Sequence, residues 1–149
     1  MPEQVGDLFD ASSALQVVAA GAAVPAFAVS VPGVADLQAG IGWNLVLEDG
    51  HDNVVSWMPD GGGTVELIVQ IGWHGAPPTD IIWCTADDAE GQIAIPQSMV
   101  EQFPIAGGIG LFQHPSWLRR VQRAVVDGPF GPIEVKAESS FGFSVEHGL

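Results

Sequence analysis

Short runs in which apolar and polar residues alternate recur along the chain, and glycine and proline separate them. The clearest run covers residues 64–71, where every second side chain is Val, Leu or Ile and where Glu66 and Gln70 occupy alternate positions. Successive side chains of a β-strand point to opposite faces of a sheet. The pattern therefore predicts a strand with one face in a core and the other, carrying Glu66 and Gln70, in water.

The same kind of pattern predicts about nine or ten short strands in all. Besides 64–71, the candidate runs are residues 14–19, 25–31, 40–47, 54–57, 81–86, 92–95, 107–113, 118–126, 133–138 and 141–145. The segment 118–126 alternates less regularly, but the β-branched residues Val121, Val125 and Val126 favour a strand over a helix. Many short strands separated by turn residues are typical of a sandwich or a barrel.

Residues 81–104 form the unit around which the other predicted strands are arranged. The pattern there predicts a buried strand, an acidic turn that closes on Gly91, a second strand that ends at Pro96, and one short helix near residues 96–103 that stops before Pro104. Upstream, the sequence Pro59-Asp60-Gly61 is typical of a tight turn, because proline presets φ and glycine accepts positive φ. We expect the strands on either side of that turn to pair as a hairpin.

The fold class that follows is all-β. We predict a β-sandwich, of immunoglobulin-like or Greek-key type, in a single domain that covers residues 1–149, with residues 1–13 as a loosely ordered lead. The composition agrees: 47% of the 149 residues are hydrophobic, enough for a core without disulfides or metal, and 19 Gly and 11 Pro punctuate the strands. Cys84 is the single cysteine, so no intramolecular disulfide exists, and its apolar neighbours indicate a small buried hydrophobe.

Charge excludes some classes of partner. Eighteen acids against four bases give a formal net charge of −14, and such a field repels phosphate backbones and anionic lipid surfaces. We therefore expect no nucleic acid partner. Direct membrane insertion is not expected either, because no apolar run approaches the roughly 18 residues of a membrane span. The bases all lie in the last third of the chain: Arg119, Arg120, Arg123 and Lys136.

Several short motifs resemble those of a sandwich domain found near the C-termini of exported proteins and lipoproteins of myxobacteria and related deltaproteobacteria. The resemblance covers most of the chain from about Gly21 onward. The motifs that carry it are Val24-Pro25-Ala26-Phe27, Val55-Ser56-Trp57 before the Pro-Asp-Gly turn, Trp83-Cys84 before Asp87-Asp88 and Gly91, Ile95-Pro96, and Phe103-Pro104. The resemblance implies a sandwich fold and an extracytoplasmic location, secreted or lipid-anchored in the full-length form, and it brings no catalytic residues with it.

The acidic turn is the weak candidate for a metal site. Asp87, Asp88 and Glu90 supply the oxygen ligands that Ca²⁺ requires, although their spacing matches no known calcium loop. The alternative is a solvated turn, which we favour. Accordingly we expect neither a bound metal nor another cofactor.

Loop aromatics are the weak candidates for a binding site. Trp73, beside His74, and Trp117, near Pro115, are expected in loops, where a tryptophan either stacks on a sugar ring or partner protein, or fills one end of the sandwich. The strand residues Trp43, Trp57 and Trp83 are instead expected in the core. No nucleophile, histidine or glycine-rich loop occurs in a recognisable catalytic context, so we assign no catalytic residue.

Three classes of function remain in order of preference. The first is a non-enzymatic structural or protein-interaction module of an exported bacterial protein, with a protein partner or self-association. The second is a carbohydrate- or calcium-binding module, which requires an exposed Trp73 or Trp117 in a concave site, or the acidic loops at residues 48–52 and 87–90 side by side. The third is a hydrolytic enzyme, which requires His74 or His114 beside a carboxylate or nucleophile in a pocket.

Overall fold

The computed structural model of the chain describes residues 13–23, 25–60, 62–71, 80–104, 115–128 and 130–147. Within these residues the fold is mostly β, with 63% strand, nine strands and one short helix. The elements in chain order are β1 (Ala14–Ala19), β2 (Phe27–Pro32), β3 (Asn44–Leu47), β4 (Asn53–Ser56), β5 (Thr64–Ile71), β6 (Asp80–Asp87), the 3₁₀ turn η1 (Asp88–Glu90), β7 (Gln92–Ile95), α1 (Gln97–Val100), β8 (Ser116–Gly128) and β9 (Gly131–His147).

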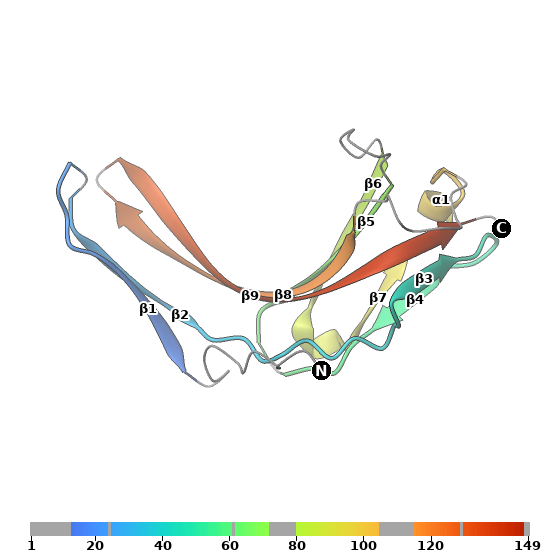
Figure 1. Ribbon diagram of the computed structural model, residues 1–149, viewed down its shortest axis with the longest axis horizontal. Helices are drawn as coiled ribbons and strands as arrows, with labels where there is room; N and C mark the ends of the chain where they lie inside the picture. The colour runs from blue at the N-terminus through green and yellow to red at the C-terminus, as the bar shows by residue number, and fades with distance from the viewer. Residues whose placement is uncertain are drawn as a thin grey trace, which may run out of the picture.

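The main sheet has five strands in the order β3-β9-β8-β5-β6, and only the β3–β9 pair is parallel. Its longest part is the β8–β9 hairpin, which pairs without interruption from Ser116 and Phe143 to Gly128 and Gly131. In Figure 1 this hairpin bends into a trough, so that the sheet is a curled half-barrel. Two smaller sheets, β1–β2 and β4–β7, lie on the convex side of the bend.

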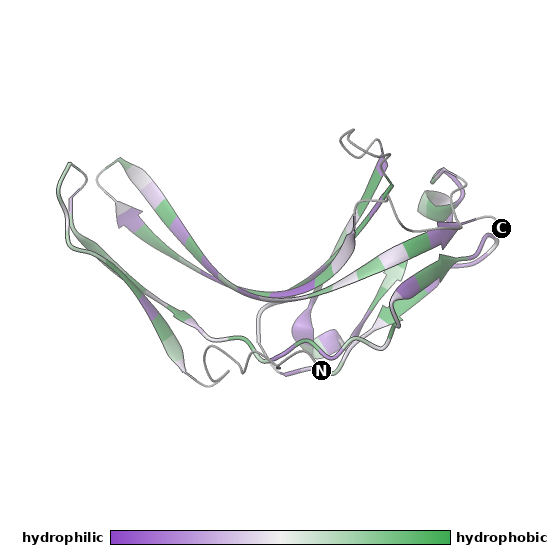
Figure 2. Cartoon of the chain, viewed as in Figure 1, coloured by the Kyte–Doolittle hydropathy of each residue, from purple (hydrophilic) through white to green (hydrophobic). Residues whose placement is uncertain are grey.

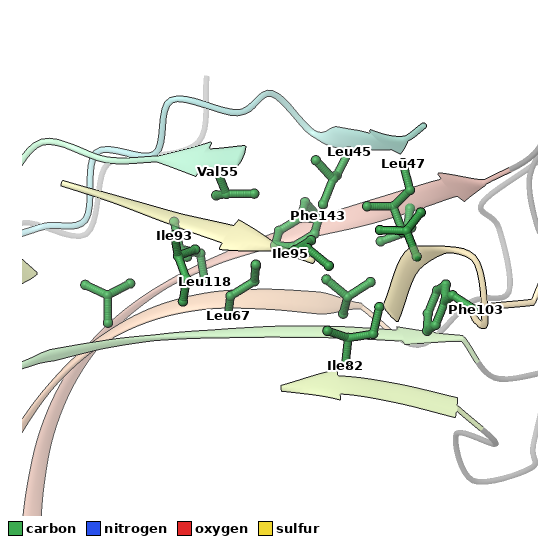
Figure 3. Close-up of a cluster of buried hydrophobic side chains, with 14 of the residues drawn as sticks. Leu45, Leu47, Val55, Leu67, Ile82, Ile93, Ile95, Phe103, Leu118 and Phe143 are labelled. Atoms are coloured by element: carbon green, nitrogen blue, oxygen red, sulfur yellow. The ribbon is translucent and has the colours of Figure 1, made fainter. Parts of the chain in front are cut away.

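The main hydrophobic core fills the space between the strands β5, β6, β8 and β9 and the layer that faces them, formed by the β4–β7 sheet, α1 and the edge strand β3 of the curled main sheet (Figure 3). One face of the main sheet and the facing sides of that layer supply the side chains. Those labelled in Figure 3 are Leu45, Leu47, Val55, Leu67, Ile82, Ile93, Ile95, Phe103, Leu118 and Phe143. The trough therefore opens on the other face of the sheet, away from this core.

The far half of the β8–β9 hairpin leaves the body and packs against the β1–β2 hairpin. We call this projection, made of β1, β2, residues 122–128 of β8 and residues 131–137 of β9, the arm (Figure 1). A second, small cluster holds its two layers together near the body: Val31, Val34 and Ala137 are buried, and Leu15, Ala124 and Val135 pack against them. Farther out the arm has little interior.

The order of elements expected at residues 81–104 is confirmed, but the expected buried strand is not: β6 lies at the edge of the main sheet, and only Ile82 of its residues is buried. Strand β6 runs into η1, Gly91 closes the turn with a positive φ of 67°, and β7 ends before Pro96. Helix α1 covers only Gln97–Val100, one turn within the expected 96–103. The segment 118–126 is also a strand as expected, and β8 extends beyond it at both ends.

Three details of the expected fold differ. Strands β4 and β5 do not pair as a hairpin, because the turn between them wraps around Asp88 and carries the chain from the β4–β7 sheet across to the main sheet. The separate strands expected at 133–138 and 141–145 are one strand, since Ser139 and Ser140 stay in the ladder opposite Arg120 and Arg119.

The third difference is the architecture itself. The expected all-β class holds, but the main sheet is a curled half-barrel and not clearly a sandwich. The reason is the length of β8 and β9: one stretch packs on the body and the other on β1–β2, so the bend between them replaces two flat facing sheets.

The packing predicts how stability responds to truncation of the core. Ile95 of β7 is fully buried, whereas Val54 on the paired strand β4 is exposed. We expect Ile95→Ala to lower the free energy of unfolding by about 2–5 kcal/mol, through lost burial and the cavity left behind. Val54→Ala should change it by less than about 0.5 kcal/mol. Urea denaturation of both variants measures the two values, and equal losses would contradict this packing.

Candidate functional site

Trp117 lies on the concave face of the main sheet and not in a loop. It is half-buried on β8, directly opposite Ile68 of β5, and Ile68 in turn lies opposite Trp83 of β6. Directly paired residues of neighbouring strands point to the same face. The three side chains therefore form one apolar row across three strands.

Trp83 was expected in the core, and that prediction is wrong. Its side chain is 64% exposed because residue 83 falls on the face opposite to the buried Ile82. Trp43 was likewise expected in the core but is 80% exposed and stacks on Phe141, with 5.5 Å between the ring centroids. Trp57 is buried as expected, and its indole Nε1–H donates to the backbone carbonyl of Asp88 at 3.0 Å.

Gly142 of β9 sits beside Trp117 and leaves room for its ring. A Cβ at position 142 would lie 3.1 Å from the indole, so the ring fits closely over this glycine. The guanidinium of Arg119 lies 5.6 Å from the Trp117 ring centroid, within the range of a cation–π contact. The Arg119 Nε is buried and has no hydrogen-bond partner within the part of the chain that the structure describes. Trp117 is thus held near the sheet surface beside a donor that none of those residues satisfies.

Paired charges continue the concave face toward the arm. Arg123 of β8 forms ion pairs with Glu66 of β5 and with Glu134 of β9, the latter with Nε 3.4 Å from Oε1. Lys136 also contacts Glu134, at 3.7 Å. Glu66 was expected to face water; it is on the expected face, but it is buried because Arg123 covers it at the bend. This part of the face is therefore a network of charges that largely neutralise each other.

Asp88, a weak candidate metal ligand, is instead the centre of a buried ion pair. Its side chain is fully enclosed, and Arg120 Nε donates to its Oδ1 at 2.9 Å, where Arg120 is itself only 2% exposed. The backbone N–H groups of Asp60 and Gly62 donate to its other oxygen, at 2.8 and 3.4 Å. Both oxygens of Asp88 are thus occupied, and neither is free to bind a metal ion.

The remaining donors of Arg120 bind backbone carbonyl groups. Nη1 donates to Ala35 at 3.1 Å and to Asp36 at 3.2 Å, and Nη2 donates to Met58. The guanidinium therefore connects β8, the turn η1, the β4–β5 turn and the segment between β2 and β3. The sequence does contain a signal for this pair: Arg120 shares its strand face with the core residue Leu118, where a charge needs a partner.

Asp87 and Glu90 are exposed on the outside of the same turn. The Asp87 N–H donates to Glu90 Oε1 at 3.4 Å, which helps to close the turn, while Asp88 points inward. The three acids of the candidate calcium site are therefore not brought together. Among the described residues, no group of three or more His, Cys, Asp and Glu side chains is arranged to hold a metal ion.

Other chemically capable side chains have structural partners. His147, buried at the end of β9, places Nδ1 3.2 Å from the Pro104 carbonyl and Nε2 3.1 Å from Asp49, so it joins the end of the sheet to two loops. Cys84 is half-buried at the edge of the core, and burial raises the pKa of its thiol, which disfavours the nucleophilic thiolate. The candidates Trp73, His74 and His114 and the candidate run 107–113 lie outside the described residues.

Comparison of the chain with protein-family models, with curated proteins and with solved structures finds no match. Among the helices that the structure describes, none has the length and apolar character needed to cross a membrane. The function of the chain is therefore inferred from the geometry of the concave face, the buried pair and the arm.

The buried pair predicts a large loss of stability when one partner is neutralised. Asp88→Asn keeps the shape of the side chain but leaves the Arg120 charge buried without a counter-charge, so we expect a loss of about 3–5 kcal/mol. Asp127→Asn, at an exposed position near the hairpin turn, should cost less than about 0.5 kcal/mol. Thermal and urea denaturation measure both, and a mild effect of Asp88→Asn would contradict the assignment.

The same pair predicts a pH dependence. Burial by itself raises the pKa of Asp88, but hydrogen bonds from the Asp60 N–H and from Arg120, the Arg120 charge and the Gly62 N–H outweigh it and hold the pKa below the ordinary value of 3.8. The unfolded chain consequently binds a proton at Asp88 at a higher pH than the native protein does. The stabilisation is therefore complete above the ordinary value and disappears as the pH falls through the native pKa.

The measurement is the free energy of unfolding of the wild type and of Asp88→Asn at several pH values. We expect a constant difference between the two proteins above about pH 5 and a shrinking difference at lower pH. A difference that stays constant into strong acid would mean that Asp88 is not held ionised by Arg120.

Proposed function

We propose that the chain is a non-enzymatic protein-interaction module of an exported bacterial protein, and that the arm engages the partner. The observation that supports this proposal is the exposure of apolar groups on a projection with little interior of its own. Val18 and Val125 are both more than 60% exposed, and Phe130, in the turn between β8 and β9, is 81% exposed. Val18 faces outward from β1–β2, whereas Val125 faces outward from β8–β9, so exposed apolar side chains occupy both outer faces of the arm. Exposed apolar surface of this kind is typical of interaction sites.

The β1–β2 half of the arm also differs in charge from the rest of the molecule. Residues 11–35, which include β1 and β2, contain no Asp, Glu, Lys, Arg or His, although the whole chain carries a net charge of −14. Figure 2 shows the β1–β2 hairpin mostly in the green and white of apolar and neutral residues. A partner that docks here meets little of the charge repulsion that the acidic body imposes.

Open strand edges add a second means of attachment. In the described part of the chain, β1 and β2 pair only with each other, β8 beyond Val121 pairs only with β9, and β9 before Ser144 pairs only with β8. Two-stranded ribbons are marginally stable alone, and their unpaired N–H and C=O groups are templates for another strand. A partner strand would therefore stabilise the arm as well as bind to it.

Two finer features belong to the same proposal. The arm places two ribbons face to face, which supports a small sandwich at this end of the molecule, and the immunoglobulin-like or Greek-key form stays a prediction. The non-enzymatic assignment is supported by the contacts of three chemically capable side chains. Asp88 is paired with Arg120, His147 contacts Asp49, and burial raises the pKa of the Cys84 thiol. The exported, extracytoplasmic location rests on the resemblance seen in the sequence motifs.

Site-specific photo-cross-linking tests the proposal. A benzophenone amino acid at position 125 places the probe on the arm, and the same residue at position 54 places it on an equally exposed part of the body. In cells that make the protein naturally, we expect irradiation to attach the position 125 variant to a protein, either another species or a second copy, and to leave the position 54 variant free.

Sedimentation velocity of the purified protein distinguishes self-association from binding to another protein. Val125→Lys should abolish the adducts formed by a second probe at position 130, in the exposed turn between β8 and β9. Thermal stability should not fall, because residue 125 is exposed and a lysine there lies opposite Glu134. Adducts of equal yield at positions 54 and 125, or none at 125, would contradict the proposed role of the arm.

A further inference from the structure

We propose that the concave face of the main sheet is a binding site for a neutral polysaccharide, with sugar rings stacked on Trp83 and Trp117. This site is separate from the arm, and it adds a second ligand of a different class. The row Trp83, Ile68 and Trp117 crosses the strands β6, β5 and β8 on the side away from the core. The fold itself does not require an indole that is 64% exposed at position 83.

The spacing of the row suits an extended glycan. Neighbouring strands lie about 4.8 Å apart, so the two tryptophans, separated by one strand, are about 10 Å apart at their backbones. The two-residue repeat of an extended β-1,4-linked polysaccharide is of the same order. The C–H face of a pyranose ring is apolar and flat enough to stack on an indole, and Ile68 provides an apolar floor between the two rings.

Polar groups flank the row on both sides, as sugar hydroxyl groups require. The next cross-strand row lies two positions farther along the strands and consists of Thr85, Glu66, Arg119 and Ser140. On the other side, Gln70 is paired with Ile81. The guanidinium of Arg119 is planar and can bind two adjacent hydroxyl groups, and the exposed hydroxyl groups of Thr85 and Ser140 add further donors and acceptors. The carboxylate of Glu66 is already paired with Arg123, and the Gln70 amide donates to the Pro115 carbonyl. Among the described residues the Arg119 Nε has no hydrogen-bond partner, so a ligand oxygen that draws the side chain outward would satisfy it.

Charge selects a neutral ligand. The charged side chains on these rows of the concave face nearly cancel in sign, with three cations against four acids: Arg119, Arg123 and Lys136 against Glu66, Asp87, Glu134 and Glu138. An acidic polymer would meet no net attraction there and would be repelled by the net charge of −14 of the chain. An uncharged polymer that binds by stacking and hydrogen bonds meets neither problem.

Affinity electrophoresis of the full chain tests the proposal. Native gels contain one soluble polysaccharide each: hydroxyethylcellulose, mixed-linkage β-glucan, galactomannan, or alginate as the polyanion. We expect at least one of the three neutral polymers to retard the wild type and alginate not to. Trp83→Ala and Trp117→Ala should each weaken the retardation about tenfold, the loss of one stacking contact.

Trp43→Ala is the matched control, because Trp43 is a still more exposed tryptophan that stacks on Phe141, on the face of β9 opposite to Gly142. It should bind like the wild type. Trp83→Ala removes an exposed side chain, so an unchanged melting temperature separates lost binding from lost folding. The proposal is overturned if no neutral polymer retards the wild type, if alginate alone does, or if Trp43→Ala weakens binding as much as Trp83→Ala.

Discussion

The buried pair of Arg120 and Asp88 is the interaction on which the arrangement of the chain depends. A guanidinium that is removed from water must find an acceptor for each of its donors, because an unpaired buried charge costs several kcal/mol. Here the acceptors come from three separate segments: Asp88 after β6, the carbonyl groups of Ala35 and Asp36 between β2 and β3, and the carbonyl group of Met58 in the β4–β5 turn. One side chain of β8 thereby determines where the body, the β4–β5 turn and the segment leading from the arm meet.

This junction lies close to the bend of the β8–β9 hairpin, and the bend creates the two surfaces to which we assign functions. On the convex side, the hairpin packs first on the core of the body and then on β1–β2, which leaves a long arm with few buried residues. On the concave side, the same strands present Trp117 and a band of paired charges to solvent. The arm and the concave face are thus two consequences of one bent hairpin, with different chemistry on its two sides.

The alternation of apolar and polar residues predicts most of the strands, since period-two patterns are local. It does not predict their partners: the turn at Pro59 and Asp60 is typical of a hairpin, yet Asp88, 28 residues later than Asp60, binds that turn and diverts the chain. The sequence also does not show whether a tryptophan in a strand is buried. An apolar ring at position 83 is suited equally to the core and to an exposed surface on which a ligand stacks. What decides between the two is that residue 83 lies on the strand face opposite to that of the buried Ile82. Which of the two faces is buried depends on where the second layer packs against the sheet.

Hydrogen–deuterium exchange of Arg120→Met, compared with the wild type, tests the central role of the pair most directly. Removing the guanidinium frees the segment between β2 and β3 and leaves the core between the main sheet and β4–β7 in place. We expect amides in residues 33–39 and in β1–β2 to lose protection much more than those of β5. Protection that falls equally in β5 and in the arm, or that does not change, would contradict the account.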